Sequence, residues 1–145
     1  MKIERSGSAV WQGRLKDGKG AVSTQSGALD NQPYGFASRF EAQAGTNPEE
    51  LIAAAHSACF TMALSMILGE AKLVATNLQT TAHVTLESVE DGFAITTVHL
   101  VLKANVPGVD QETFHKLATA AKLNCPVSKL LNAKISLAIE LNTAP

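Results

Sequence analysis

The chain has 145 residues, of which 46% are hydrophobic, and its formal net charge is −1. This length suits one domain over residues 1–145, and the hydrophobic fraction is sufficient for a substantial core. Because the chain has no basic tract, neither a nucleic-acid-binding surface nor an anionic-membrane surface is expected. The first residues contain no apolar stretch of the secretory type, so the expected location is the cytoplasm.

The N-terminal part, up to about Gln43, is predicted to form short strands separated by glycines. Gly18 and Gly20 favour a hairpin in this part, and residues 28–33 are expected to form a loop. The expected strands are Ser8–Gln12, Gly20–Gln25 and Tyr34–Glu41.

A strong helix-start signal follows at residues 46–50. Asn47 can cap the first turn and Pro48 suits the first helical position, while Glu49 and Glu50 complement the positive end of the helix dipole. From Leu51 to Gly69 the chain has no Asp, Glu, Lys or Arg. The pattern predicts a helix from about Pro48 to Leu68 that ends near Gly69.

This apolar run is long enough to cross a membrane. It contains polar side chains and is rich in alanine rather than leucine, and the rest of the chain is amphipathic, as in a water-soluble domain. These features favour a central core helix, apolar on nearly all sides, over a membrane span. The polar residues are His56, Ser57, Thr61 and Ser65.

The C-terminal half is predicted to contain two long strands, a helix, a short helical segment and a last strand. Asp91-Gly92 is a hairpin signal between the two long strands, and Asp110 is a candidate cap for the helix. In chain order these elements are Leu78–Val89, Phe93–Val106, Asp110–Leu123, Pro126–Leu131 and Ala133–Leu141.

The order of strands, long helix, strands, helix and strand indicates an α+β fold, with antiparallel sheets packed around a long central buried helix. One small sheet can cover only one side of such a helix. A second subunit is therefore expected to cover the other side, which predicts a homodimer.

The chain has two cysteines, Cys59 in the middle of the long helix and Cys125 directly before Pro126. In a reducing cytosol a cysteine pair is more often reactive, metal-binding or simply buried than a permanent structural disulfide. A buried thiol is normally inert, whereas a thiol at the start of a helix can have a lowered pKa. On local physics Cys125 is therefore at least as good a nucleophile as Cys59, and the spacing does not decide between them.

Four further side chains have both a chemical and a plain structural interpretation. Arg39 could stabilise a thiolate or be a solvated strand charge, and Glu49 and Glu50 are sufficiently explained as first-turn acids. His56, one turn before Cys59, could be a base, a metal ligand or a satisfied core histidine. A metal site is weakly supported because the chain has no C-x-x-C or H-x-x-x-H pattern, and no phosphate-binding glycine loop is present.

The stretch from Gly45 to Phe60 closely resembles the first cysteine motif of the osmotically inducible protein C and organic hydroperoxide resistance family (OsmC/Ohr). The segment Cys125-Pro126-Val127-Ser128 matches the second motif, and the resemblance extends over nearly the whole chain. Details that look like the OsmC branch are Trp11, Gly18-Lys19-Gly20, Pro33-Tyr34-Gly35-Phe36 and Arg39-Phe40-Glu41.

The resemblance implies an intertwined homodimer with sites at the subunit interface, and a cysteine-based peroxidase in oxidative and osmotic stress defence. Cys59 matches the peroxidatic cysteine, Cys125 the resolving cysteine and Glu49 the catalytic glutamate, and Arg39 looks like the OsmC-branch arginine. The implied partners are an organic hydroperoxide as substrate and an external dithiol, such as a dihydrolipoyl group, as reductant. No metal or flavin is needed for this chemistry. The alternative is a non-enzymatic stress protein that binds a small hydrophobic ligand.

Overall fold

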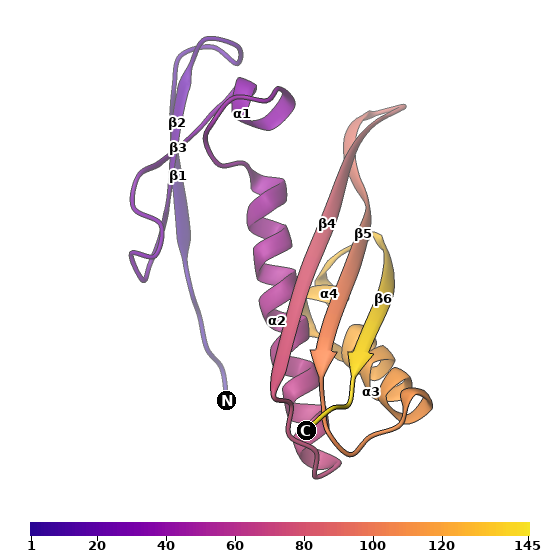
Figure 1. Ribbon diagram of the computed structural model, residues 1–145. Coiled ribbons are helices and arrows are strands. Elements are labelled where there is room, and N and C mark those ends of the chain that lie inside the picture. The colour runs from indigo at the N-terminus through magenta and orange to yellow at the C-terminus, as the bar shows by residue number, and fades with distance from the viewer. The chain divides into compact units, whose positions relative to one another are not determined.

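The computed structural model describes all 145 residues, which form six strands and four helices (Figure 1). The chain divides into two compact units, Met1–Leu51 and Ile52–Pro145. A single domain over the whole chain stays a prediction. In chain order the elements are β1 (Gly7–Gln12), β2 (Lys19–Thr24), β3 (Gln32–Tyr34), α1 (Phe36–Phe40), α2 (Pro48–Glu70), β4 (Asn77–Val89), β5 (Gly92–Asn105), α3 (Gln111–Asn124), α4 (Pro126–Leu130) and β6 (Lys134–Asn142).

The first unit contains an antiparallel sheet in the order β1-β2-β3. Trp11 on β1 pairs with Gly20 on β2, and Gly20 pairs with Tyr34 on β3. A side chain at Gly20 would collide with both aromatic rings, whose centroids lie 5.6 Å apart. Glycine at this position therefore lets the two rings pack across the middle strand.

The strand expected over Tyr34–Glu41 is wrong, because β3 ends at Tyr34 and the helical turn α1 follows. The Ser38 hydroxyl accepts a hydrogen bond from the Gly35 N–H at 2.9 Å, which closes the first turn. The Phe36 and Phe40 rings, four residues apart, contact each other with centroids 5.0 Å apart. These local contacts outweigh the strand preference of the aromatic residues.

Helix α2 begins where the sequence signal predicts. The Asn47 side chain accepts a hydrogen bond from the Glu50 N–H at 2.8 Å, which confirms the cap. The Glu50 carboxylate accepts from the Thr46 hydroxyl, also at 2.8 Å. The helix runs without a break to Glu70, slightly past its expected end near Gly69.

The second unit contains a sheet in the order β4-β5-β6. Strands β4 and β5 form the expected antiparallel hairpin, but β6 lies parallel to β5, so the expectation of purely antiparallel sheets is wrong for this pair. The reason is the connection: α3 and α4 carry the chain back to the end of the sheet where β5 began, and such a crossover produces a parallel neighbour.

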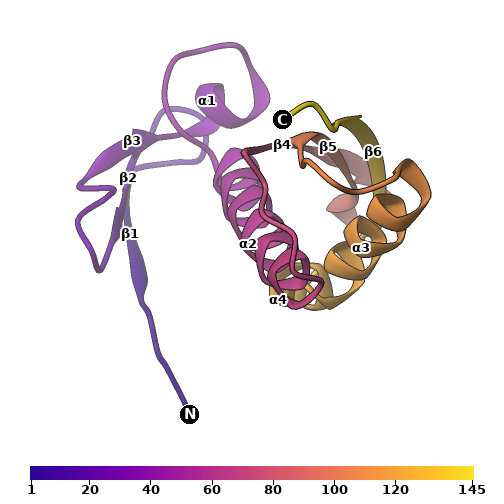
Figure 2. The same cartoon turned by 60° about the horizontal axis from the view of Figure 1, so that its bottom comes forward.

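Helices α2 and α3 lie against the same face of this sheet (Figures 1 and 2). Alternate side chains of β5 point toward the helices, as the period of a strand requires, and the facing side chains of both helices are also buried. The fully buried core includes Phe60, Leu64, Val98, Leu100, Leu102, Phe114 and Ala118.

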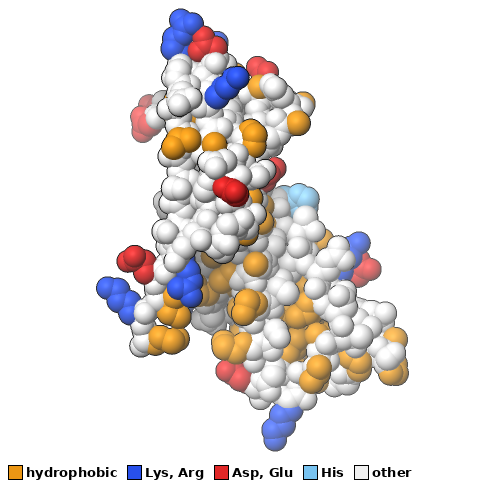
Figure 3. All heavy atoms as spheres, turned by 90° about the vertical axis from the view of Figure 1, so that its left-hand side faces the viewer, with side chains coloured by type: hydrophobic (Ala, Val, Ile, Leu, Met, Phe, Trp, Pro, Cys, Tyr) orange, Lys and Arg blue, Asp and Glu red, His pale blue; other side chains and the backbone are white.

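Only one face of α2 is buried within a single chain. The buried positions recur every four residues, at His56, Phe60, Leu64 and Leu68, whereas Met62 and Met66 are 75% and 63% exposed. Hydrophobic side chains gather on the lower half of the molecular face in Figure 3. The helix is long and apolar enough to cross a membrane by length and composition alone. Full burial of α2, and the homodimer expected to supply it, stay predictions.

Candidate active site

Arg39 and Glu49, two of the four expected site residues, form an ion pair. The Arg39 Nη2 and Nε atoms donate to Glu49 Oε1 at 2.8 Å and 3.1 Å, and Nε lies 3.3 Å from Oε2. The Glu49 side chain is 11% exposed and the Arg39 side chain 37% exposed. A guanidinium held through two nitrogens has a fixed orientation, which a lysine could not reproduce.

Two hydrogen bonds from side chains to main-chain carbonyls fix α1 against the start of α2. The Ser38 hydroxyl donates to the Thr46 carbonyl at 2.9 Å, and the Asn47 amide donates to the Ser38 carbonyl at 3.1 Å. Arg39 follows Ser38 directly, and Glu49 lies in the first turn that Asn47 caps. These contacts bring Arg39 and Glu49 together from two different helices.

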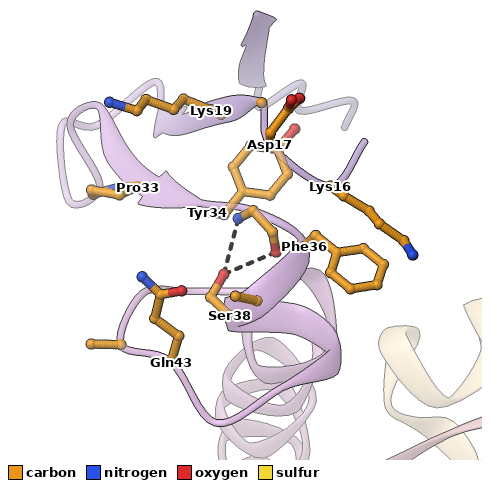
Figure 4. Close-up of a pocket in the computed structure, with 13 residues that line it drawn as sticks. Lys16, Asp17, Lys19, Pro33, Tyr34, Phe36, Ser38 and Gln43 are labelled. Atoms are coloured by element: carbon orange, nitrogen blue, oxygen red, sulfur yellow. Dashed lines mark hydrogen bonds between the residues drawn. The ribbon is translucent and has the colours of Figure 1, made fainter. Parts of the chain in front are cut away.

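Two cavities lie in the first unit. The larger one, about 470 Å³, is lined by residues from the β1–β2 turn, the end of β3 and α1. Figure 4 shows this cavity with the Ser38 hydroxyl bonded to the Gly35 main chain at its wall. The smaller one, about 320 Å³, has Arg39 among mostly apolar walls made by Trp11, Leu15, Tyr34, Phe36 and Phe40. An apolar cavity with one cation suits a small molecule with a hydrocarbon part and a polar or anionic group.

The second unit brings the two thiols together. Cys59 on α2 and Cys125 at the start of α4 are both free thiols, Cys59 half-buried and Cys125 fully buried. Cys59 packs against the core cluster that contains Cys125, and the Cys125 side chain and the Val127 main chain both affect the pKa of the Cys59 thiol as near neighbours. Proximity of two thiols is one condition for a disulfide between them.

The surroundings within this unit do not favour the Cys59 thiolate. Burial raises the pKa of the Cys59 thiol and is the largest cause, and the hydrogen bond with Cys125 raises this pKa further. The Val127 N–H lowers the pKa of Cys59 and so offsets part of the rise. A reactive Cys59 therefore needs a cation from outside this set of contacts.

His56 has a hydrogen-bond partner that the sequence does not reveal. Its ring is fully buried, and Nε2 lies 2.8 Å from the Ser128 hydroxyl of α4. Burial lowers the pKa of His56, so the ring is neutral at pH 7. The only indication of this partner in the sequence is the serine of the second cysteine motif. The spacing between His56 and Ser128 does not predict that they form a hydrogen bond. No group of three or more His, Cys, Asp or Glu side chains is arranged to hold a metal ion.

Comparison with known proteins gives matches over nearly the whole chain. The chain is 53% identical over 143 residues to the "Peroxiredoxin OsmC" of Escherichia coli (strain K12), covering 99% of this chain and 100% of that protein. It is 29% identical to the "Organic hydroperoxide resistance protein OhrB" of Bacillus subtilis (strain 168), covering 84% of this chain and 88% of that protein.

Solved structures agree with the fold. The crystal structure of OhrB from Bacillus subtilis superposes with a TM-score of 0.73 at 28% identity, covering 93% of this chain and 98% of that chain. An OsmC-like protein from Vibrio cholerae superposes with a TM-score of 0.75 at 15% identity, over 96% and 100% of the two chains, and so supports the fold alone. The family model described as "OsmC-like protein" matches residues 41–140. The chain therefore belongs to the OsmC-like protein family.

Proposed function

We propose that this protein is a cysteine-based peroxidase that reduces organic hydroperoxides to alcohols in oxidative and osmotic stress defence. The observation that carries the proposal is the proximity of Cys59 and Cys125, which lie far apart in the chain but pack in one core cluster. The relationship to a peroxiredoxin and to organic hydroperoxide resistance proteins supports the same activity.

The reaction starts at Cys59. Its thiolate attacks the distal peroxide oxygen, the O–O bond breaks, and the alkoxide leaves as an alcohol after taking up a proton. Cys59 is then a sulfenic acid. The Cys125 sulfur attacks the Cys59 sulfur, a disulfide forms, and the hydroxyl leaves as water. An external dithiol, for which a dihydrolipoyl group is our candidate, reduces the disulfide to two thiols and is itself oxidised.

Arg39 is our candidate for the cation that Cys59 needs. A guanidinium stabilises a thiolate and the negative charge that develops on the leaving oxygen. Glu49 holds Arg39 in one orientation through two nitrogens. Glu49 and Arg39 are therefore assigned to activation of Cys59, and Cys125 to resolution.

The helix geometry favours a site built from two subunits. Glu49 and Cys59 are ten positions apart on the unbroken α2, which is roughly 15 Å along the helix axis. Neither side chain is long enough to close that separation. We infer that Arg39 and Glu49 of one chain act on the Cys59 of a second copy in a homodimer. We place this dimer in the cytoplasm, where reducing conditions keep both thiols available.

Thiol titration of the reduced protein tests the activity. One equivalent of cumene hydroperoxide should remove two titratable thiols per chain, and the intact mass should fall by two hydrogens. The Cys59→Ser variant is the control and should keep its remaining thiol. If the wild-type protein loses no thiols, the peroxidase proposal is wrong. That outcome would favour a non-enzymatic binding protein that uses the apolar cavity beside Arg39.

A further inference from the structure

The buried hydrogen bond between His56 and Ser128 joins the two segments that carry the thiols. His56 lies three residues before Cys59 on α2, and Ser128 lies three residues after Cys125 on α4. The bond is 2.8 Å long and connects residues that are 72 positions apart in the chain. It therefore ties α4 to α2 about one helical turn from each sulfur.

Apart from this bond and the Val127 main chain at the Cys59 sulfur, helix α4 has few directional contacts that fix its position. It has only five residues, no side chain caps its start, and none of its residues is fully buried. Half-buried apolar side chains such as Val127 contact the core, but apolar contacts are not directional and tolerate small shifts. A hydrogen bond to a buried ring is directional, so it specifies both the rotation and the position of α4.

Burying a histidine ring at this position in the core is unfavourable for the free energy of folding. The His56 ring is fully buried, and its Nδ1 atom is also buried and has no hydrogen-bond partner. Leucine would fill a similar volume without burying an unpaired polar atom. The polar residue is therefore better explained by the position it imposes on α4 than by a contribution to stability.

We infer that His56 and Ser128 are positioning residues for the resolving step. Their hydrogen bond keeps Cys125 against the Cys59 sulfur while Cys59 is a sulfenic acid, so the disulfide forms before a second hydroperoxide can oxidise Cys59 to a sulfinic acid. This inference rests on the proposed function, because it requires that Cys59 is oxidised and that Cys125 resolves it.

The test compares variants that remove or keep the bond. His56→Leu and Ser128→Ala remove it, whereas His56→Gln and Ser128→Thr keep a polar group of similar reach. Each protein is treated with one and with ten equivalents of cumene hydroperoxide, and mass spectrometry measures the ratio of sulfinic acid to disulfide. Dimedone trapping measures how long the sulfenic acid persists.

His56→Leu and Ser128→Ala should raise the ratio of sulfinic acid to disulfide by roughly three- to tenfold, the range that the loss of one hydrogen bond implies. The double variant should show no larger effect than either single variant, because both remove the same bond. His56→Gln and Ser128→Thr should stay within about twofold of wild type. If His56→Leu does not fold, the result for Ser128→Ala alone decides the test.

Thr61→Val is a matched control. It removes two part-buried hydrogen bonds of α2, the 2.7 Å contact with Thr80 on β4 and the 2.7 Å bond to the Ser57 carbonyl, and neither bond involves α4. Its ratio should equal that of wild type. An equal rise in Thr61→Val, or unchanged ratios in both His56→Leu and Ser128→Ala, would overturn the positioning role. If wild type forms no Cys59–Cys125 disulfide at all, it is the proposed function that fails.

Discussion

Arg39 donates to Glu49 at 2.8 Å, and Glu49 lies on the same unbroken helix as Cys59, ten residues before it. The ion pair is therefore fixed at one end of α2, roughly 15 Å along the axis from the thiol on the same chain. We predict that a cation so placed acts on the Cys59 thiol of a second copy, so that the proposed chemistry depends on a homodimer.

The roles of the two thiols can be separated by serine substitution. Cys59→Ser should abolish turnover, because in the proposed mechanism the Cys59 sulfur takes the peroxide oxygen. Cys125→Ser should still form one sulfenic acid at Cys59, which dimedone traps and mass spectrometry locates. If dimedone instead labels Cys59→Ser and not Cys125→Ser, the two roles are reversed.

Arg39→Ala should raise the pKa of Cys59. A guanidinium beside a thiolate favours the charged form, so its loss should move the pH profile of Cys59 alkylation upward by about one to two units. Arg39→Lys should restore only part of the effect, because an ammonium cannot pair with Glu49 through two nitrogens.

Arg14→Ala is the control for this experiment. Arg14 is an exposed arginine of the same unit, paired with Asp17 at 2.6 Å, and its loss should leave the alkylation profile unchanged. A shifted profile in Arg14→Ala together with an unchanged one in Arg39→Ala would assign the role to Arg14. Unchanged profiles in both variants would dismiss both arginines and direct attention to Lys16 or Lys19.

Protonation of His56 should destabilise the fold at low pH. Burial lowers the pKa of His56 in the folded state, whereas the unfolded value is about 6.5. The stability that depends on neutral His56 is complete above pH 6.5 and is lost as the pH falls from there through the lowered folded pKa, by at most about 1.4 kcal/mol per pH unit. Urea unfolding between pH 7.5 and 4.5 measures this slope.

The His56→Gln variant isolates the contribution of this ring, since glutamine does not titrate. Its free energy of unfolding should depend less on pH than that of wild type in the same range. Equal slopes for both proteins would show that His56 is not kept neutral by the fold.

Several features of the fold follow from local sequence signals, and others do not. The start of α2 was predictable because Asn47, Pro48 and the two acids act within one turn. The parallel pairing of β6 with β5 was not, because alternating side chains look the same in parallel and antiparallel strands. The α1 turn was missed because it depends on where the Ser38 hydroxyl bonds.

The candidate site was likewise only partly predictable from the sequence. The residue types of Arg39, Glu49, Cys59 and Cys125 are visible in the sequence, and a family resemblance assigns their roles. The partner of His56 was not predictable, because Ser128 lies 72 positions away and only the folded chain brings the two together. Contacts between distant segments depend on the packing of α4 against α2, which no local pattern encodes.

The exposed apolar face of α2 should be an interface between two copies. Met62→Glu places a charge where a second subunit would bury a side chain that is 75% exposed in one chain. Burying methionine contributes about 1.5–3 kcal/mol, and burying an unpaired carboxylate costs more, so the variant should dissociate. Light scattering after size exclusion measures the mass. Thr85→Glu, a matched change on the exposed face of β4, should remain dimeric, and a dimeric Met62→Glu would place the interface elsewhere.

Subunit exchange between two inactive variants tests most directly the claim that Arg39 and Glu49 of one chain activate the Cys59 of another. Glu49→Ala and Cys59→Ser are mixed and allowed to exchange, and mass spectrometry confirms the heterodimer. In the heterodimer one site keeps Glu49 from one chain and Cys59 from the other, so about half of the wild-type activity per dimer should return at that single site. Confirmed exchange without any hydroperoxide reductase activity would contradict the shared site.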